Sequence, residues 1–151
     1  MSTKKLGWMA NVFIHSGIAY LPVLGWTDAG MYYEHGPVLT CSADHAALAS
    51  TLAELKALGN PAMPHPSREA LDKASPVEKA MRIRGFKKMA REGVVVAVIS
   101  QLEESWRVAF SPADAADVQL IDHDQASKLP LDAGLEDIAK CILEEVGSRR
   151  N

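Results

Sequence analysis

The pattern of hydrophobic and polar positions centres on an apolar run at residues 94–99, VVVAVI. β-Branched side chains favour a strand over a helix, and a short apolar run without polar alternation is typical of a strand covered on both faces. The polar residues 101–105 then predict a hairpin loop. Alternation resumes at Trp106, Val108 and Phe110, which indicates a return strand with one buried face. These two strands predict a hairpin at the centre of a sheet.

Three stretches near the start of the chain have strand-like patterns: residues 9–16, 18–26 and 31–41. Gly17 and the turn-forming residues 27–30 separate them, so the pattern predicts an antiparallel meander. Pro22 has no N–H to donate to a neighbouring strand, which places the second strand at a sheet edge or gives it a bulge. The third strand is expected to be interrupted at Gly36-Pro37.

A helix is predicted after this meander, because leucines recur at helical spacing at Leu48, Leu52, Leu55 and Leu58. Ser42 is the expected N-cap, and Asp44 then lies in the first turn. Gly59 suits the position after the last turn, and Asn60-Pro61 stops the helix. The proline-rich residues 60–66 predict a stiff, extended loop.

The middle of the chain contains a second helix start. Ser75 and Glu78 have the spacing of a capping box, with Pro76 at the first helical position. A helix is expected over residues 85–92. Residues 81–84 alternate in a strand-like way, so the segment before Gly85 stays open between helix and strand.

The last third of the chain predicts one strand and one helix. Residues 118–121 alternate and indicate a short strand, and residues 121–128 read as a polar loop. Asp132 is the expected cap of a final helix that ends at Gly147, followed by a frayed tail at residues 148–151. The helix has one apolar stripe: Leu135, Ile138, Ala139, Ile142 and Val146.

This order of elements predicts an α+β fold, in which helices pack against an antiparallel sheet built from the meander and the central hairpin. Residues 1–151 fit a single domain, which at this length buries a core without a metal or a disulfide. Cys41 and Cys141 are expected to be reduced, small core residues, although the sequence alone leaves a disulfide between them open.

Charge is unevenly distributed along the chain. The net charge of −3 argues against direct nucleic-acid binding by the whole protein. Residues 68–91 carry mainly lysine and arginine, whereas residues 114–145 carry mainly aspartate and glutamate. This asymmetry predicts two faces of opposite potential.

Residues 6–27 contain no Asp, Glu, Lys or Arg, which imitates a signal peptide or a membrane span. However, Asn11, Pro22 and several glycines interrupt the run, and no A-x-A cleavage site follows it. We therefore expect no leader, no membrane partner and a cytoplasmic location.

The sequence contains only weak signals for catalysis, metal binding or cofactor binding. Asp122-His123-Asp124 offers metal-ligating side chains, but neighbours on an extended chain point to opposite sides and no second ligand pair follows, so we expect no metal. No nucleophile elbow, phosphate loop or dinucleotide fingerprint is present, and no cofactor is expected. The one enzymatic alternative is a thiol-dependent reaction at Cys41, assisted by His45 four residues later.

Two groups of residues are candidates for binding another protein. Aromatic side chains beside carboxylates are typical of interface hot spots, and this pattern selects Trp26, Asp28, Tyr32, Tyr33 and Glu34. The acidic last third supplies the second group: Asp122, Asp124, Glu136, Asp137 and Glu144. An ordinary solubilising surface is the alternative interpretation of the second group.

One stretch resembles a known family. It runs IAYLPVLGWTDAGMYYEHGPV and, after the first predicted helix, GNPAMPHPSRE. A Y-x-P strand, a T-[ED]-A-G-x-Y turn and a G-N-P helix end followed by spaced prolines and an arginine are similar to the immunity proteins of bacterial contact-dependent growth inhibition systems. The matching positions are Tyr20, Pro22, Thr27, Asp28, Ala29, Gly30, Tyr32 or Tyr33, Gly59, Asn60, Pro61, Pro64, Pro66 and Arg68.

The resemblance implies a cytoplasmic protein without enzymatic activity that tightly binds and neutralises a cognate toxin domain, often a nuclease. On this hypothesis we expect a 1:1 complex. A compact acidic domain suits such a partner, because complementary charge speeds encounter and buried aromatic anchors slow release. A protein-binding adaptor of another kind would use the same surface and stays open as an alternative.

Overall fold

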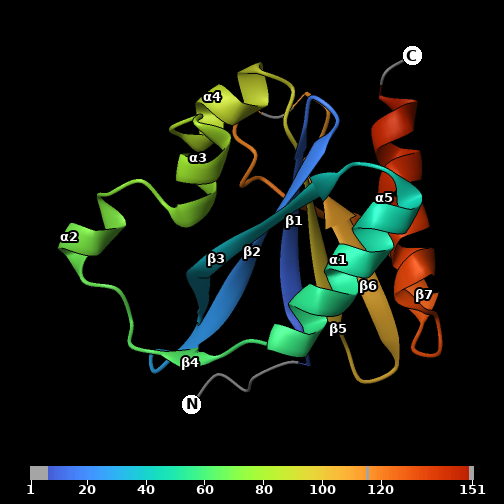
Figure 1. Ribbon diagram of the computed structural model, residues 1–151, viewed down its shortest axis with the longest axis horizontal. Helices are drawn as coiled ribbons and strands as arrows, with labels where there is room; N and C mark the ends of the chain where they lie inside the picture. Colours follow the sequence, from blue (N-terminus) through green and yellow to red (C-terminus); the bar gives the residue numbers. More distant parts are fainter. Residues whose placement is uncertain (1–6, 115, 150–151) are drawn as a thin grey trace.

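Six long strands form the centre of the computed structural model, which describes residues 7–114 and 116–149 (Figure 1). They are ordered β3-β2-β1-β5-β6-β7, and each pairs with its neighbour in antiparallel fashion. A short seventh strand pairs in parallel with the end of β2. The strand bounds are β1 (Met9–His15), β2 (Ile18–Thr27), β3 (Tyr32–Ser42), β4 (Ala62–Met63), β5 (Val95–Gln101), β6 (Ser105–Phe110) and β7 (Asp122–Pro130). This architecture confirms the predicted α+β fold with a meander and a central hairpin.

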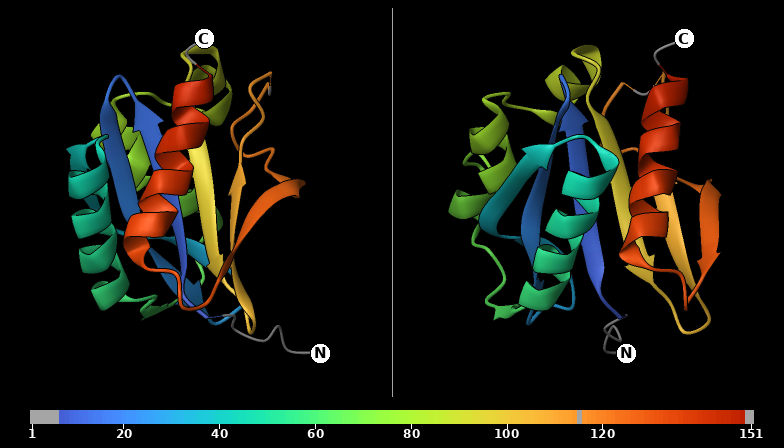
Figure 2. Two further views of the ribbon diagram at one scale, coloured as in Figure 1. Left: turned by 90° about the vertical axis from the view of Figure 1, so that its right-hand side faces the viewer. Right: turned by 45° about the vertical axis from the view of Figure 1, so that its right-hand side comes forward.

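Two long helices lie side by side on one face of the sheet (Figure 2). They are α1 (His45–Leu58) and α5 (Leu135–Ser148), and the predicted apolar positions of each face the sheet except Leu58, which is exposed at the last turn of α1. Their leucine and isoleucine side chains join inward-facing residues of β1, β2, β5 and β6 in the larger core cluster. None of the described helices is long and apolar enough to cross a membrane.

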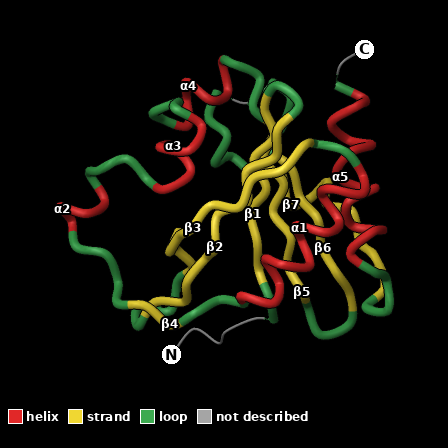
Figure 3. The backbone as a smooth tube through the Cα atoms, in the orientation of Figure 1, coloured by secondary structure: helices red, strands yellow, loops and turns green. Residues whose placement is uncertain are grey.

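The opposite face of the sheet is covered only in part, by short helices that follow one another along the chain (Figures 1 and 3). They are α2 (Arg68–Leu71), α3 (Pro76–Met81) and α4 (Phe86–Arg91). Val77, Met81 and Met89 pack from α3 and α4 onto the sheet, while α2 has no buried residue. Residues 94–99 are buried on both sides, as their unbroken apolar run predicted.

The predicted bulge at Pro22 is confirmed, although β2 is an interior strand and not an edge strand. The register between β2 and β3 shifts between Pro22 and Leu24. The extra residues on β3 include Gly36-Pro37, whose peptide bond is cis. The expected interruption is therefore a local irregularity inside a continuous strand.

Both predicted N-caps of the long helices are wrong. β3 extends through Ser42, which pairs with Ile18, so Asp44 is the first residue free to cap α1, and its side chain accepts from Ala47 N at 2.9 Å. In α5 the cap position is Gly134, and Asp137 accepts from the Gly134 N–H at 3.0 Å. In each case the true cap lies two residues after the expected one.

The region between β6 and α5 corrects two further predictions. Residues 118–121 form a loop and not a strand, with Asp117 accepting from Gln119 N at 2.8 Å. Residues 122–130, expected as a polar loop, form the edge strand β7. Most of its side chains are exposed, so pairing with β6 comes from backbone hydrogen bonds that a polar sequence does not reveal.

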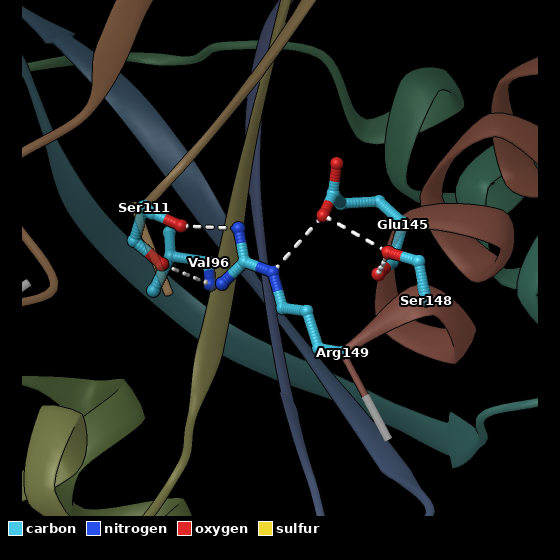
Figure 4. A network of polar contacts seen from close by, with 5 residues as sticks. All are labelled: Val96, Ser111, Glu145, Ser148 and Arg149. Atoms are coloured by element: carbon cyan, nitrogen blue, oxygen red, sulfur yellow. Dashed lines mark hydrogen bonds and ion pairs between the residues drawn. The ribbon is translucent and has the colours of Figure 1, made fainter. Parts of the chain in front are cut away.

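The C-terminal end of α5 is anchored to the sheet (Figure 4). The predicted frayed tail is therefore wrong for Ser148, which ends the helix, and for Arg149, which is its C-cap. The Arg149 guanidinium donates to the Ser111 carbonyl and to Glu145 Oε2. Residues 150–151 of the expected tail lie outside the described residues. Cys41 and Cys141 are both free thiols, half-buried where they pack against the α1–α5 side of the core.

Candidate functional site

A groove of about 730 Å³ opens on the sheet face that α1 and α5 leave uncovered. Its floor is formed by β1 and β5, through Met9, Asn11, Phe13, Val96 and Val98. Residues 66–78 and residues 118–123 form its walls, so segments far apart in sequence meet here. A concave, mainly apolar site of this size with a few polar groups is typical of a binding site.

One end of the groove owes its shape to a divergence between β1 and β2. Direct pairing of these strands extends only to Phe13 and Tyr20. Beyond it, the side chain of Asn60 spans the gap, accepting from Met9 N at 3.0 Å and donating to the carbonyls of Met9 at 2.9 Å and Leu24 at 3.0 Å. The predicted Asn60-Pro61 helix stop therefore also holds two strands at a fixed separation.

The loop after Asn60 is pinned to the turn between β2 and β3. Thr27 is almost fully buried, and its hydroxyl accepts from Met31 N at 3.2 Å. Asp28 Oδ1 accepts from His65 N at 3.0 Å, and the His65 ring meets the Tyr33 ring edge-on at 5.4 Å between centroids. Asp28 thus has a structural contact within the chain.

Aromatic side chains extend from this corner towards the groove. Trp26 and Tyr32 are cross-strand partners, and their ring centroids lie 4.8 Å apart. The Tyr32 hydroxyl donates to the Gly7 carbonyl at 3.2 Å, and burial raises the pKa of Tyr32 above its usual value. Tyr32 and Tyr33 both line the groove.

Glu34 follows these tyrosines on β3 and lines the same groove. Its Oε1 accepts from Val77 N at 2.8 Å, in the first turn of α3. Burial raises the pKa of Glu34, with the nearby Glu78 charge adding to the rise, while bonds from Val77 and Ser75 oppose it. Glu34 is therefore a largely desolvated carboxylate.

Glu78 is a second carboxylate on the groove wall, with a different environment. It accepts from Ser75 N at 2.9 Å, which completes the predicted capping box, and from Gly85 N at 2.7 Å. Burial alone would raise its pKa, but these hydrogen bonds and the Arg84 charge lower the pKa of Glu78 overall.

Asn11 places an amide in the apolar floor of the groove, between Met9 and Phe13 on the same strand. Its side-chain oxygen is buried and has no hydrogen-bond partner within the described residues. A buried polar atom without a partner costs stability, so its presence needs a reason. Asn11 was not among the predicted site residues, although a polar residue at an inward position of an apolar strand is a signal that the sequence contains.

The predicted partner-binding residues fall on separate surfaces. Trp26, Tyr32, Tyr33 and Glu34 gather at the β2–β3 end of the groove. Asp122 and Asp124 lie on β7 on either side of His123, which lines the groove. The other three residues, Glu136, Asp137 and Glu144, lie on α5, which packs on the opposite face of the sheet.

The proposed thiol pair has separate contacts in the structure. His45 Nε2 lies 3.0 Å from the Glu136 carbonyl at the start of α5. Cys41 is half-buried against the core, and no hydrogen bond joins it to His45 among residues 7–114 and 116–149. Within the same ranges, no three His, Cys, Asp or Glu side chains gather as a metal site, Asp122-His123-Asp124 included.

Comparisons with known proteins bear on the fold. No family model matches the sequence, and no curated protein matches it. A solved structure of a protein of unknown function from Neisseria meningitidis is similar, with a TM-score of 0.58 and 14% identity, over 99% of this chain and 97% of that chain. At this identity the likeness shows a shared arrangement of sheet and helices and nothing about activity.

Proposed function

We propose that this chain is an immunity protein that binds and neutralises a cognate toxin domain of a contact-dependent growth inhibition system, through a 1:1 complex in the cytoplasm. The single observation that carries the proposal is where the signature residues lie. Thr27, Asp28, Asn60 and Pro61 build one corner of the molecule, where the Pro61 carbonyl accepts from Trp26 N at 2.8 Å. That corner holds the Tyr32 and Tyr33 side chains at the groove.

Two physical features favour a binding role, one of the groove side and one of the chain as a whole. Rigid aromatic side chains supply contact area at a low cost in conformational entropy, and Trp26, Tyr32 and Tyr33 are fixed by ring and hydrogen-bond contacts. Net negative charge would also attract a basic nuclease domain and raise the association rate.

The direct test is co-expression with the product of the neighbouring open reading frame. We expect this chain to rescue growth of cells that express that toxin domain, and to co-purify with it at a 1:1 ratio by light scattering. The association rate should fall as salt rises, because exposed charges are screened. Failure to rescue growth and to bind the toxin would refute the proposal.

A matched pair of variants locates the binding face. Tyr33→Ala removes a groove-lining ring, whereas Leu58→Ala removes an exposed apolar side chain from the end of α1. We expect the first to weaken toxin binding at least about tenfold and the second to leave it unchanged. Glu144→Lys on the α5 surface reports on the second predicted group, and loss of binding there instead would move the interface to α5.

The thiol-enzyme alternative makes a different prediction. A catalytic Cys41 thiol would react with iodoacetamide much faster than an ordinary cysteine, because only a thiolate is nucleophilic. A Cys41→Ser variant that still protects cells at the wild-type level would favour the binding function. Loss of protection in a folded Cys41→Ser variant would favour the enzyme.

A further inference from the structure

The described residues that line the groove include two acidic and two basic side chains. Glu34 and Glu78 contribute carboxylates, Lys73 contributes an amine and His123 contributes an imidazole. Lys73 is exposed, so its charge is well solvated. A carboxylate in a low-dielectric cavity acts more strongly on a nearby charge than the same group does in water.

Glu34 is the carboxylate that lacks a cation. Its contacts are the Val77 N–H and the Ser75 side chain, and no lysine, arginine or histidine nitrogen forms an ion pair with it among the residues described. Glu78, in contrast, receives two backbone N–H bonds and the favourable charge of Arg84. A largely desolvated and unpaired carboxylate is costly, and an incoming cation would reduce that cost.

The apolar lining of the groove indicates which other side chains a bound segment would carry. Met9, Phe13, Val96 and Val98 offer a hydrophobic floor, and Tyr32 and Tyr33 lie beside Glu34 at one end. A volume of about 730 Å³ holds several side chains and not a folded element. These features fit an extended segment with apolar side chains and a single charge.

We propose that the groove receives an apolar polypeptide segment of the protein partner carrying one arginine or lysine, whose cationic group pairs with Glu34. The proposal rests on the proposed function, because it names the chemistry of the toxin segment that would be bound. The basic side chains of residues 68–91 that surround this face are mostly exposed and disfavour a segment with further positive charges. One cation among apolar neighbours is therefore the best complement.

A short acetylated peptide, Ala-Leu-Arg-Leu-Phe amide, is a direct probe. Two matched peptides replace its arginine by citrulline, which keeps the shape without the charge, or by glutamate. Binding to the full chain is followed by heteronuclear NMR, which also maps the amides that shift. We expect saturable binding with a Kd of about 1 mM or below, shifts around Glu34 and Val96, and at least about tenfold weaker binding of the citrulline peptide.

Glu34→Gln tests the assigned residue and keeps the oxygen that accepts from Val77. Glu54→Gln on α1 is the control, since it removes the same charge from an exposed site on the helix-covered side. Glu34→Gln should weaken the arginine peptide about tenfold and leave the citrulline peptide unaffected, while Glu54→Gln changes neither. Equal binding of all three peptides, shifts confined to α1 and α5, or no saturable shift up to about 10 mM would each overturn the proposal.

This inference and the proposed function fail in different ways. If the chain neutralises its toxin but Glu34→Gln binds that toxin like the wild type, the role of the groove is wrong and the immunity function stands. If the neighbouring toxin is neither bound nor neutralised while the arginine peptide binds in a Glu34-dependent manner, the groove chemistry stands and the immunity function falls.

Discussion

Glu34 Oε1 accepts a hydrogen bond of 2.8 Å from the backbone N–H of Val77 and so joins the edge strand β3 to the first turn of α3. The first N–H groups of a helix have no partner within the helix. Ser75 caps one of them, and Glu34 satisfies another from a strand that lies far away in sequence. The same carboxylate thus helps to position a wall of the groove.

Replacing Glu34 by glutamine should change how stability depends on pH. The pKa of Glu34 lies above its ordinary value of 4.5, so the folded chain holds this proton more tightly than the unfolded chain. The resulting stability is present below about pH 4.5 and is lost as pH rises through the folded pKa. Urea unfolding should therefore show Glu34→Gln gaining stability relative to the wild type from about pH 4 to about pH 7.

Glu78→Gln is the control, because its stability relative to the wild type should change with pH in the opposite direction. The pKa of Glu78 is lowered in the folded chain, so its contribution is present above the ordinary value of 4.5 and is lost as pH falls through the folded pKa. This variant should lose stability relative to the wild type as pH rises. Unfolding curves whose differences from the wild type do not change with pH in either variant would contradict both assignments.

Asn11→Leu should stabilise the protein. The side-chain oxygen of Asn11 is buried without a partner among the described residues, and the groove beside it has room for a larger apolar side chain. We expect the free energy of unfolding to rise by about 1 to 2 kcal/mol. Val12→Ala, at the neighbouring fully buried position that faces α1 and α5, should instead destabilise. A loss of stability in Asn11→Leu would show that the amide has a structural partner.

The core could be predicted from the sequence because each buried face of a helix or strand places apolar residues at a regular spacing along the chain. Residues 94–99 have no polar position, and all six side chains are buried. The stripe that includes Leu48 and Leu52 has helical spacing, and α1 buries that stripe up to Leu55. In these segments local propensity and tertiary packing agree.

Cap positions and the last strand could not be predicted from local signals. Ser42 and Asp44 are both good N-cap residues, and the choice depends on how far β3 pairs with β2. β7 carries polar side chains because it is an edge strand with exposed surfaces, so no apolar alternation marks it.

The candidate site was predicted only at its β2–β3 end. Trp26, Tyr32, Tyr33 and Glu34 are close in sequence, so their neighbourhood is visible in one stretch. The groove also needs residues 66–78 and 118–123, and these reach it through tertiary packing that no local pattern records.

Asn60→Ala should destabilise the chain more than an ordinary surface change. The side chain makes three hydrogen bonds of 2.9 to 3.0 Å, and it bridges strands that do not pair directly at this point. We expect a loss of about 3 kcal/mol in urea unfolding, because backbone groups of Met9 and Leu24 would lose their partner. Gln125→Ala on the exposed part of β7 should change stability by less than about 0.5 kcal/mol. Equal effects of the two variants would refute this role for Asn60.

Arg149→Ala should release the end of α5 from the sheet. The guanidinium bonds to the Ser111 carbonyl, and Ser111 in turn exchanges hydrogen bonds with the Val96 backbone (Figure 4). The Arg149 side chain is only 18% exposed, so we expect a loss of about 1 kcal/mol and faster hydrogen exchange near Val146. Lys140→Ala on the same helix breaks an exposed 3.9 Å ion pair and should cost less than about 0.5 kcal/mol.

Gly25→Ala should displace the loop that closes the groove, and a second substitution should reverse the effect. A Cβ at Gly25 would clash with Met63 Sδ and lie 2.8 Å from Met63 Cγ, so the Met63 side chain must move. We expect a loss of about 1 to 3 kcal/mol in urea unfolding, since overpacking of a close contact strains its surroundings. Gly25→Ala combined with Met63→Ala removes the clash and should recover most of that loss, beyond the sum of the single effects. Strictly additive losses would mean that the strain comes from the Pro61 carbonyl, 3.1 Å from the same Cβ, and not from Met63.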